Sequence, residues 1–464
     1  MRRFLSARRL LAVAAAGCSV PALLVAGAAP AAVYAGGAPA ASTGGSAASA
    51  HRCLVMTGSG DPAFTRNFNP YTATGLPSGS FVQGAFYEPL IVTAEGGLKP
   101  VPWLARSWAW SHGNKTLTLN IVRGAKWSDG KALTASDVVY SLTAGRQDKI
   151  MDRVGLTGAA NNIASVRAKG AAKVVISLKT PDSQFISSTL NRQFVVPRHI
   201  WSKVKDPSNY TNSRPVGSGP FDRITRFTTQ DYVFGKNLHY WRKGQPRIAC
   251  LEYVQAASND AALALIQSGQ VDWTHNFVPN VDKAYVSKDR KHFHAFYATT
   301  AYPISLVLDT THYPYSIAAF RKALSLAIDR KTVSKLGEYG YAPPTDAIGL
   351  NGLFPSWVSN PAVKKQAQQM AAYNPSAAKK LLNKWKVTLI PSKQRKIATQ
   401  LEKIFLQQMP IVPLFIGPRW STYSTRYFHC FNSPKNFYGD PIFTTFPDNA
   451  LSFTRICPGG KAGP

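Results

Sequence analysis

Residues 84–142 carry the clearest structural pattern of the chain and read GAFYEPLIVTAEGGLKPVPWLARSWAWSHGNKTLTLNIVRGAKWSDGKALTASDVVYSL. Residues 107–110 and 116–122 are rich in Trp, Thr, Leu, Ile and Val, and the polar residues 111–114 lie between them. This pattern predicts a β-hairpin. Apolar and polar side chains alternate along the second strand, so one face of the hairpin is expected to be buried.

A short helix is predicted directly after the hairpin. Thr134 is followed three residues later by Asp137, which is the capping-box spacing, and the apolar residues Val138, Val139 and Leu142 follow. Nothing in the stretch is nucleophilic, metal-binding or phosphate-cradling. We therefore interpret it as scaffold.

The amino-acid sequence of residues 84–142 resembles that of the extracytoplasmic substrate-binding proteins of ABC importers for peptides, nickel and some oligosaccharides (solute-binding protein family 5). Further blocks that resemble the family follow in its order, at residues 215–221 (PVGSGPF), 260–273, 313–330 and 374–382. The two glycines of the first of these blocks can adopt positive φ angles. The resemblance implies an α/β fold with two lobes, of the class II periplasmic-binding-protein type, with a hinge and an extra small subdomain in the first lobe.

Residues 1–35 are predicted to be an export signal, because arginines precede an apolar stretch. Two endings stay open: acylation of Cys18 in a lipobox-like sequence, or cleavage at small residues near 28–35. Residues 36–50 contain only Ala, Gly, Ser, Thr and Pro, and are expected to form a flexible tether. The protein is thus expected to be exported, to the periplasm or the cell surface, with a lipid anchor if Cys18 is acylated.

The resemblance also implies the lobe boundaries. The first lobe is expected at residues 51–295 and 426–464, with the small subdomain at about 86–195, and the second lobe at 296–425. Relatives carry about a hundred more residues in the second lobe, whereas this chain has only a few near 385–391. Peptide-binding relatives keep there an acidic residue that receives the peptide's ammonium group, and no residue of this chain is assigned that role. Three explanations of the shorter second lobe stay open: a deletion variant, an artefact of the gene model, or a genuine minimal receptor.

The charge of the chain is unusual. Its 464 residues include 54 Lys and Arg but 23 Asp and Glu, a net charge of +31, while 45% hydrophobic residues exclude general disorder. Nucleic-acid binding is one reading, but the basic residues are spread along the chain and no recognition motif accompanies them. Together with the export signal, the positive charge favours an exported protein that acts near anionic wall polymer or lipid, or in acid surroundings. We expect no nucleic-acid partner.

The cysteines and histidines do not predict catalysis. Cys53, Cys250, Cys430 and Cys457 can form two disulfides in an exported chain, and spacing does not choose among three pairings. His292 and His294 lie two residues apart, but no third metal ligand accompanies them. There is no Gly-x-Ser-x-Gly motif. We therefore expect no enzyme activity, metal or cofactor.

Positions within the resemblance suggest which residues contact a ligand. An extended segment of the first lobe could add a strand to a bound peptide, although a turn is an equal reading. A loop at residues 336–344, with the wording GEYGY, resembles members that bind cello-oligosaccharides. The predicted contacts are Thr74, Gly75 and Leu76 in the first lobe and Tyr302, Ser305 and Trp357 opposite them.

Three functions follow. The first is a monomeric substrate-binding component that captures an oligopeptide or dipeptide and delivers it to ABC permease subunits in the membrane. The second is the same role for an oligosaccharide, with Trp103, Tyr302, Trp357 and Trp420 stacking on sugar rings unless they are ordinary core residues. The third is a binding-impaired, cationic wall-associated protein, whose binding would fall steeply with salt.

Overall fold

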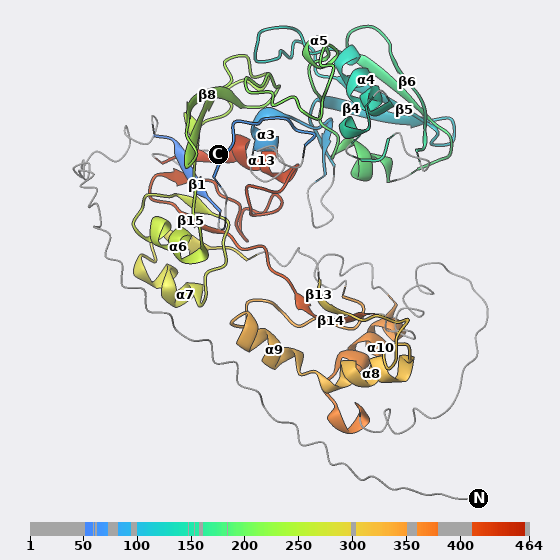
Figure 1. The fold of residues 1–464 in the computed structure, drawn as a ribbon, viewed down its shortest axis with the longest axis vertical. Coiled ribbons are helices and arrows are strands. Elements are labelled where there is room, and N and C mark those ends of the chain that lie inside the picture. The colour runs from blue at the N-terminus through green and yellow to red at the C-terminus, as the bar shows by residue number, and fades with distance from the viewer. Residues whose placement is uncertain are drawn as a thin grey trace, which may run out of the picture. The chain divides into compact units, whose positions relative to one another are not determined.

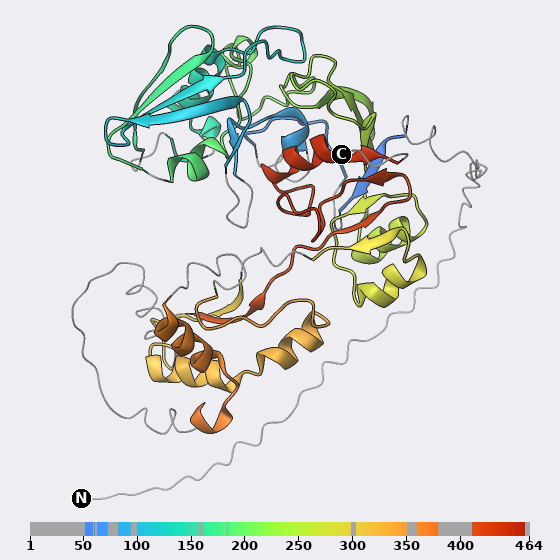
Figure 2. The same ribbon diagram turned by 180° about the vertical axis from the view of Figure 1, so that it is seen from behind.

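The computed structural model describes the following residues, all within the unit formed by residues 44–464: 52–58, 60, 63–72, 82–93, 100–146, 148–152, 154–156, 161–182, 184–297, 303–349, 360–378 and 411–459. The predicted export signal, the whole predicted tether and the shortened region near 385–391 lie outside them. The chain is mixed α/β, as predicted (Figures 1 and 2).

The largest sheet has seven strands. Their order is β12 (Phe293–Ala295), β15 (Thr422–Ser424), β11 (Trp273–Thr274), β1 (Leu54–Thr57), β10 (Cys250–Val254), β9 (Asp231–Lys236) and β8 (Phe221–Phe227). β1 runs parallel to both β10 and β11, and the other pairs are antiparallel. We call this the main sheet. It unites segments from the beginning, middle and end of the sequence.

Aromatic side chains fill the core beside the main sheet. The Trp273 ring packs edge-on against Phe443 at 5.0 Å and against Phe431 at 5.7 Å, and it is buried. Phe234 of β9 packs edge-on against Phe86 at 4.7 Å. Large buried rings remove much apolar surface from water and favour such edge contacts, so they supply much of the stability of this sheet.

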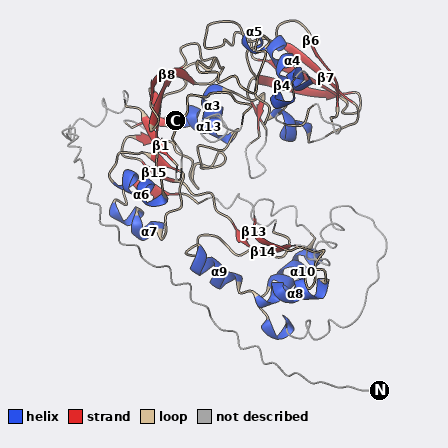
Figure 3. Cartoon of the chain, viewed as in Figure 1, coloured by secondary structure: helices blue, strands red, loops and turns tan. Residues whose placement is uncertain are grey.

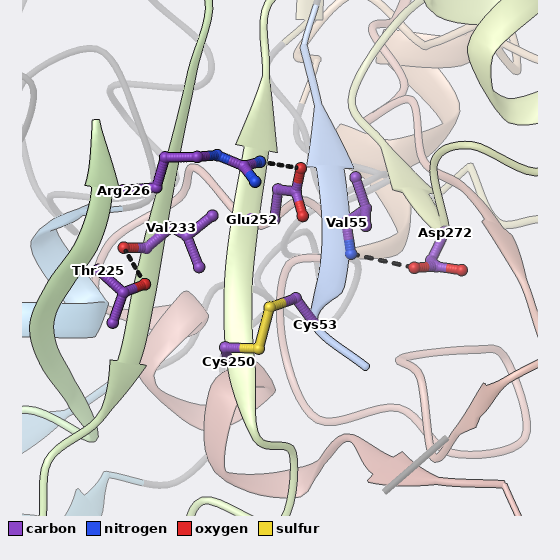
Figure 4. Close-up of a disulfide and its surroundings, with 8 residues drawn as sticks. All are labelled: Cys53, Val55, Thr225, Arg226, Val233, Cys250, Glu252 and Asp272. Carbon is purple, nitrogen blue, oxygen red and sulfur yellow. Dashed lines mark hydrogen bonds and ion pairs between the residues drawn. A yellow bond between two sulfur atoms is a disulfide. The ribbon is translucent and has the colours of Figure 1, made fainter. Parts of the chain in front are cut away.

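A disulfide and polar side-chain contacts join strands of the main sheet (Figure 4). Cys53 beside β1 is bonded to Cys250 of β10. The Val55 amide donates to the Asp272 carboxylate at 3.0 Å, and Arg226 lies 2.6 Å from the Glu252 carboxylate. These bonds hold together strands that lie far apart in the sequence.

A second sheet, which we call the small sheet, has the order β4 (Ala105–Ser111), β5 (Thr116–Ile121), β7 (Lys173–Leu178) and β6 (Ile163–Ala168), all antiparallel. β4 and β5 confirm the predicted hairpin, and the apolar side chains of β5 are buried. Helix α4 (Ala135–Thr143) lies against β6 and β7 (Figure 1). Its capping box between Thr134 and Asp137 is confirmed.

The Gly217–Ser218–Gly219 turn corrects one detail of the sequence analysis. Neither glycine adopts a positive φ angle. A Cβ atom on Gly217 would instead overlap the Phe86 carbonyl oxygen, and one on Gly219 would overlap that of Ala85. Glycine is required here because two backbone segments approach closely, not because the turn is left-handed.

A third β-structure is the two-stranded ribbon of β13 (Pro303–Val307) and β14 (Ile411–Ile416). Helices α8 (Ala318–Ala327), α9 (Arg330–Gly337) and α10 (Pro361–Ala371) accompany it, coloured in Figure 3. Buried Arg330 donates to the carbonyls of Pro413 at 2.7 Å and Ala371 at 2.9 Å. The Asp329 side chain caps α9, so these two neighbouring residues cap the helix and cross-link the fold.

The remaining elements are short. They are α3 (Val82–Phe86), the pair β2 (Ile91–Val92) and β3 (Val101–Pro102), the single turns Ala144–Arg146, Lys149–Met151, Ile186–Leu190 and Val286–Lys288, α5 (Arg198–Trp201), α6 (Asn259–Gln267), α7 (Val281–Ala284), α13 (Asp448–Arg455) and the pair β16 (Phe428–His429) and β17 (Cys457–Pro458). Cys430 and Cys457 form a second disulfide. Helix α13 packs against α3 (Figure 1).

Candidate functional site

The carboxyl edge of the parallel strands β1, β10 and β11 is the first place to search for a ligand. In open α/β sheets, ligands bind outside the carboxyl ends of the strands. Two chain segments connect the main sheet to the ribbon, one between β12 and β13 and one between β14 and β15. The side chains that these segments contribute to the edge therefore define the candidate site.

Five aromatic side chains gather beside these connections, and we call them the hinge aromatic cluster: Phe277, Tyr297, Tyr339, Tyr341 and Trp420. Trp420 packs edge-on against Phe277 at 4.6 Å and against Tyr297 at 4.4 Å. Tyr341 packs edge-on against Tyr297 at 5.2 Å, and Tyr339 lies 6.4 Å from Phe277. The cluster thus joins residues that follow β11 and β12 to residues that follow α9 and β14.

The members of the hinge aromatic cluster are all partly exposed, and Tyr339 is 50% exposed. The Tyr341 hydroxyl donates to the Asp282 carboxylate at 2.7 Å. The Tyr297 hydroxyl is buried and has no hydrogen-bond partner among the described residues. Burial raises the pKa of Tyr297 above its usual range. These rings offer faces and one hydroxyl for contact with a ligand.

Tyr339 also has a strained backbone. Its φ angle is +53°, a value that residues other than glycine adopt uncommonly. Such conformations cost roughly 1–3 kcal/mol and cluster at functional sites. The strained residue carries the exposed Tyr339 ring, which lies beside Phe277. The strain is therefore a further reason to treat the cluster as functional.

Polar residues lie close to the same edge. The Arg419 guanidinium forms an ion pair with buried Asp440 at 3.0 Å, and the Thr445 hydroxyl donates to Asp440 at 3.0 Å. His275 follows β11, where burial, together with the positive charge of Arg419, lowers its pKa to about 4. His275 is therefore neutral at pH 7. No nucleophile is paired with a base in this group of residues, so it can position a ligand but offers no catalytic arrangement.

Residues 99–410 match the family model described as bacterial extracellular solute-binding proteins, family 5 Middle. The chain belongs to this family. The match covers all four strands of the small sheet, the main-sheet strands β8 to β12 and the ribbon helices. The family resemblance in the sequence is confirmed.

Curated relatives of this family 5 protein include the glutathione-binding protein GsiB of Salmonella choleraesuis. It is 26% identical over 68% of this chain and 58% of its own length. A putative ABC transporter peptide-binding protein of Brucella ovis is 27% identical over 70% of this chain and 58% of its own length. The chain thus spans less than two thirds of the length of these relatives.

A solved structure gives the same fold. The periplasmic oligopeptide-binding protein of Thermotoga maritima superposes with a TM-score of 0.74 at 18% identity, covering 87% of this chain and 99% of that one. Its mannohexaose-bound form superposes with a TM-score of 0.70 at 18% identity, covering 89% and 100%. The two-lobed periplasmic-binding-protein fold predicted from the sequence is confirmed.

Most predicted contact residues of the family 5 chain cannot be located. Thr74, Gly75, Leu76, Tyr302 and Trp357 lie outside the described residues, as does Cys18. Ser305 lies in β13, partly buried, with its hydroxyl 3.4 Å from the Pro303 carbonyl. The structure does not bring Ser305 into the hinge aromatic cluster by any contact that it describes.

The two remaining tryptophans proposed for sugar stacking have different environments. Trp420 belongs to the hinge aromatic cluster, but Trp103 is 1% exposed and cannot receive a ligand. Its indole donates to the buried Glu88 carboxylate at 2.7 Å, and the Arg242 guanidinium lies 3.7 Å from its ring centroid. Trp103 is therefore a core residue.

Sequence reasoning missed Phe277 and Tyr297. It noted the loop that carries Tyr339 and Tyr341, but each missed residue is a single aromatic in an irregular segment with no motif around it. The one available signal was position, because each follows a short apolar strand that ends at the same sheet edge.

Other site types were also searched in the described part of the chain. It contains no group of three His, Cys, Asp or Glu residues arranged for a metal ion, and His292 instead contacts Asp289 at 2.9 Å. No described helix combines the length and apolar character needed to span a membrane. Two open cavities, of about 650 and 490 Å³, are lined by residues outside the hinge aromatic cluster.

Proposed function

We propose that this protein is the substrate-binding component of an ABC importer, which captures an oligopeptide or dipeptide outside the cytoplasm and delivers it to a membrane permease. Its family membership and the peptide- and glutathione-binding names of its relatives support this role. The role requires no chemistry on the ligand, in keeping with a site built from aromatic rings and paired polar groups.

We propose the lobes of this receptor from strand pairing: the main and small sheets would form the first lobe, and the ribbon with α8, α9 and α10 the second. The predicted second lobe extends to residue 425, but the pairing of β15 (Thr422–Ser424) with β11 and β12 of the main sheet favours an earlier boundary. We therefore place the return to the first lobe before Thr422.

The hinge aromatic cluster carries the proposal, because it draws on both proposed lobes at the segments that join them. Hinge motion of such segments closes binding proteins around their ligands. The flat faces of Tyr339 and Trp420 would pack against the side chains and amide planes of a bound peptide, and aromatic surfaces supply much of the energy of such contacts.

The test is thermal unfolding of the full chain in the presence of mixed dipeptides and oligopeptides. A ligand at a hundred times its dissociation constant adds about 2.7 kcal/mol to stability, which is a shift of a few degrees. The Tyr339→Ala variant should lose this shift. Tyr373→Ala is the matched control, because Tyr373 is equally exposed but lies outside the cluster. If peptides never shift the melting temperature, or both variants keep the shift, the proposed site is wrong.

An oligosaccharide is the second candidate ligand. Partly exposed aromatic rings suit sugar faces, and the structurally similar Thermotoga maritima protein has been solved with mannohexaose bound. Cello-oligosaccharides therefore belong in the same thermal assay. A shift that needs a free amine on the ligand favours the peptide, and a shift with neutral sugars alone favours the oligosaccharide.

Export is part of the proposed role. We propose that residues 1–35 are removed or that Cys18 is acylated, and that the mature protein acts as a monomer. The mass and N-terminal sequence of the protein recovered from a bacterial host distinguish the two endings. Recovery of the unprocessed chain from the cytoplasm would contradict both.

A further inference from the structure

A basic pocket lies at one end of the small sheet, away from the hinge aromatic cluster. Its volume is about 490 Å³. The side chains that matter here are four cations and two uncharged polar residues: Arg106, Arg123, Lys169, Lys173, Asn120 and Thr134. No aspartate or glutamate lines it.

Strand pairing explains why these cations meet. Ser107 of β4 pairs with Asn120 of β5, and Asn120 pairs with Lys173 of β7. Ser107 and Lys173 therefore stand on either side of Asn120, about 10 Å apart by the usual strand spacing. Arg106 is the extra residue of a register shift between Ala105 and Ser107, which brings it next to Ser107 on the β4 side. Lys169 lies in the turn that leads into β7, where its amide donates to the Lys173 carbonyl at 2.8 Å.

The positive charges of the basic pocket are not compensated. All four cationic residues are exposed, and none of them forms an ion pair with another described residue. Asp137 lies near Thr134 in sequence, but it is buried and its carboxylate already accepts from the amides of Thr134 and Arg198. It is therefore not available to pair with these cations.

The larger cavity, of about 650 Å³, differs from the basic pocket in its charges. It also holds three lysines, but Asp129 and Asp206 line it with them. Asp129 pairs with His199 at 2.7 Å and with Lys131 at 4.0 Å. Charge compensation is thus available in that cavity and missing in the basic pocket, although both lie in a chain of net charge +31.

We propose that the basic pocket binds an anion that carries several phosphate groups. Arginine binds phosphate oxygens in pairs and lysine acts as a point charge, so both favour this chemistry. Cations on both sides of Asn120 match more than one phosphate group. The uncharged polar residues are already engaged, because the Asn120 amide donates to the Ser107 hydroxyl at 2.9 Å and the Thr134 hydroxyl donates to Asp137 at 3.1 Å, so the cations carry the recognition. This site is independent of the proposed transport role.

The test measures binding of tripolyphosphate to the full chain by calorimetry. The variant Arg106→Gln with Lys173→Gln removes two pocket charges, and Lys364→Gln with Lys365→Gln removes two exposed charges from α10. Both double variants have the same net charge. We expect saturable binding that weakens about tenfold or more in the pocket variant and less than about twofold in the control. Equal weakening, or no saturable binding to the wild type, would overturn the proposal.

Two further arms identify the source of the phosphate groups. Inorganic phosphate should bind more weakly than tripolyphosphate, and equal affinity would contradict a site for several phosphates. Vesicles of phosphatidylglycerol test a lipid surface. Loss of vesicle binding in the pocket variant alone supports the site and assigns its phosphates to lipid, whereas vesicle binding that both double variants retain counts against the pocket. The affinity for tripolyphosphate should also depend less steeply on salt concentration in the pocket variant than in the wild type and the control.

Discussion

Strand β1 of the main sheet and strand β13 of the ribbon are similarly apolar but are buried very differently. All four residues of β1 are buried, whereas in β13 Ile304 is 46%, Leu306 38% and Val307 82% exposed among the described residues. β1 has hydrogen-bonded neighbours on both edges, whereas β13 pairs with β14 alone among the described strands. Apolar sequence therefore predicts a strand, but the number of packed neighbours decides how much stability that strand contributes.

The largest expected effect is loss of a core ring from the main sheet. Trp273→Ala should lower the free energy of unfolding by about 3–5 kcal/mol, because it removes a buried indole and leaves a cavity. Leu306→Ala in the ribbon should cost less than about 1.5 kcal/mol, because that side chain is partly in water already. Guanidinium denaturation of both variants measures the difference. Similar losses would mean that the ribbon is as well packed as the sheet.

Removal of the disulfides should have the next largest effect. Cys53→Ser with Cys250→Ser should cost about 2–4 kcal/mol. This bond closes a loop with a sequence separation of 197, against 27 for Cys430–Cys457. Because a crosslink that closes a longer loop removes more entropy from the unfolded chain, loss of the Cys53–Cys250 bond should cost about 2 kcal/mol more than loss of the Cys430–Cys457 bond. Denaturation of the two double variants tests this, and a greater cost for the shorter loop would contradict it.

The pH dependence of stability should arise in the main sheet. Burial raises the pKa of Asp272 to about 6, despite the opposing Arg52 charge. The folded protein therefore holds this proton more tightly than the unfolded chain, and the resulting stability is lost as the pH rises through 6. Between pH 4 and 7 the wild type should lose on the order of 1–3 kcal/mol relative to Asp272→Asn.

Asp329, which caps α9, provides the control. A hydrogen bond from the Thr332 hydroxyl at 2.8 Å lowers the pKa of its carboxyl. Asp329→Asn should therefore leave the profile between pH 4 and 7 nearly unchanged. The opposite pH dependence of His275 is present in all three proteins and cancels in the comparison. A flat difference between the wild type and Asp272→Asn would contradict the assigned shift.

The smallest expected effect is at Val307. Val307→Ser should change the free energy of unfolding by less than about 0.5 kcal/mol, because the side chain is mostly in water. The same change should reduce self-association, since exposed apolar side chains on a ribbon favour it. Denaturation and light scattering measure the two effects. A loss of stability as large as that of Trp273→Ala would show that Val307 is covered in solution.

The sequence predicted the small sheet and its helix well. The hairpin of β4 and β5 follows from alternation with a period of two, and the Thr134–Asp137 capping box follows from a spacing of three. Both depend on neighbours within a few positions. The same reasoning expected positive φ angles at Gly217 and Gly219, and it was wrong because contact with a segment 130 residues away governs that turn.

The candidate sites were much less accessible to such reasoning. The pairing of Cys53 with Cys250 was one of three possibilities until β1 and β10 were seen to be neighbours. The hinge aromatic cluster and the basic pocket likewise assemble residues from separate elements. Local sequence was enough to establish the family, the scaffold and the excess of positive charge, because these depend on composition and short-range pattern. Which distant side chains share a site depends on strand pairing and burial, which arise only when the chain packs on itself.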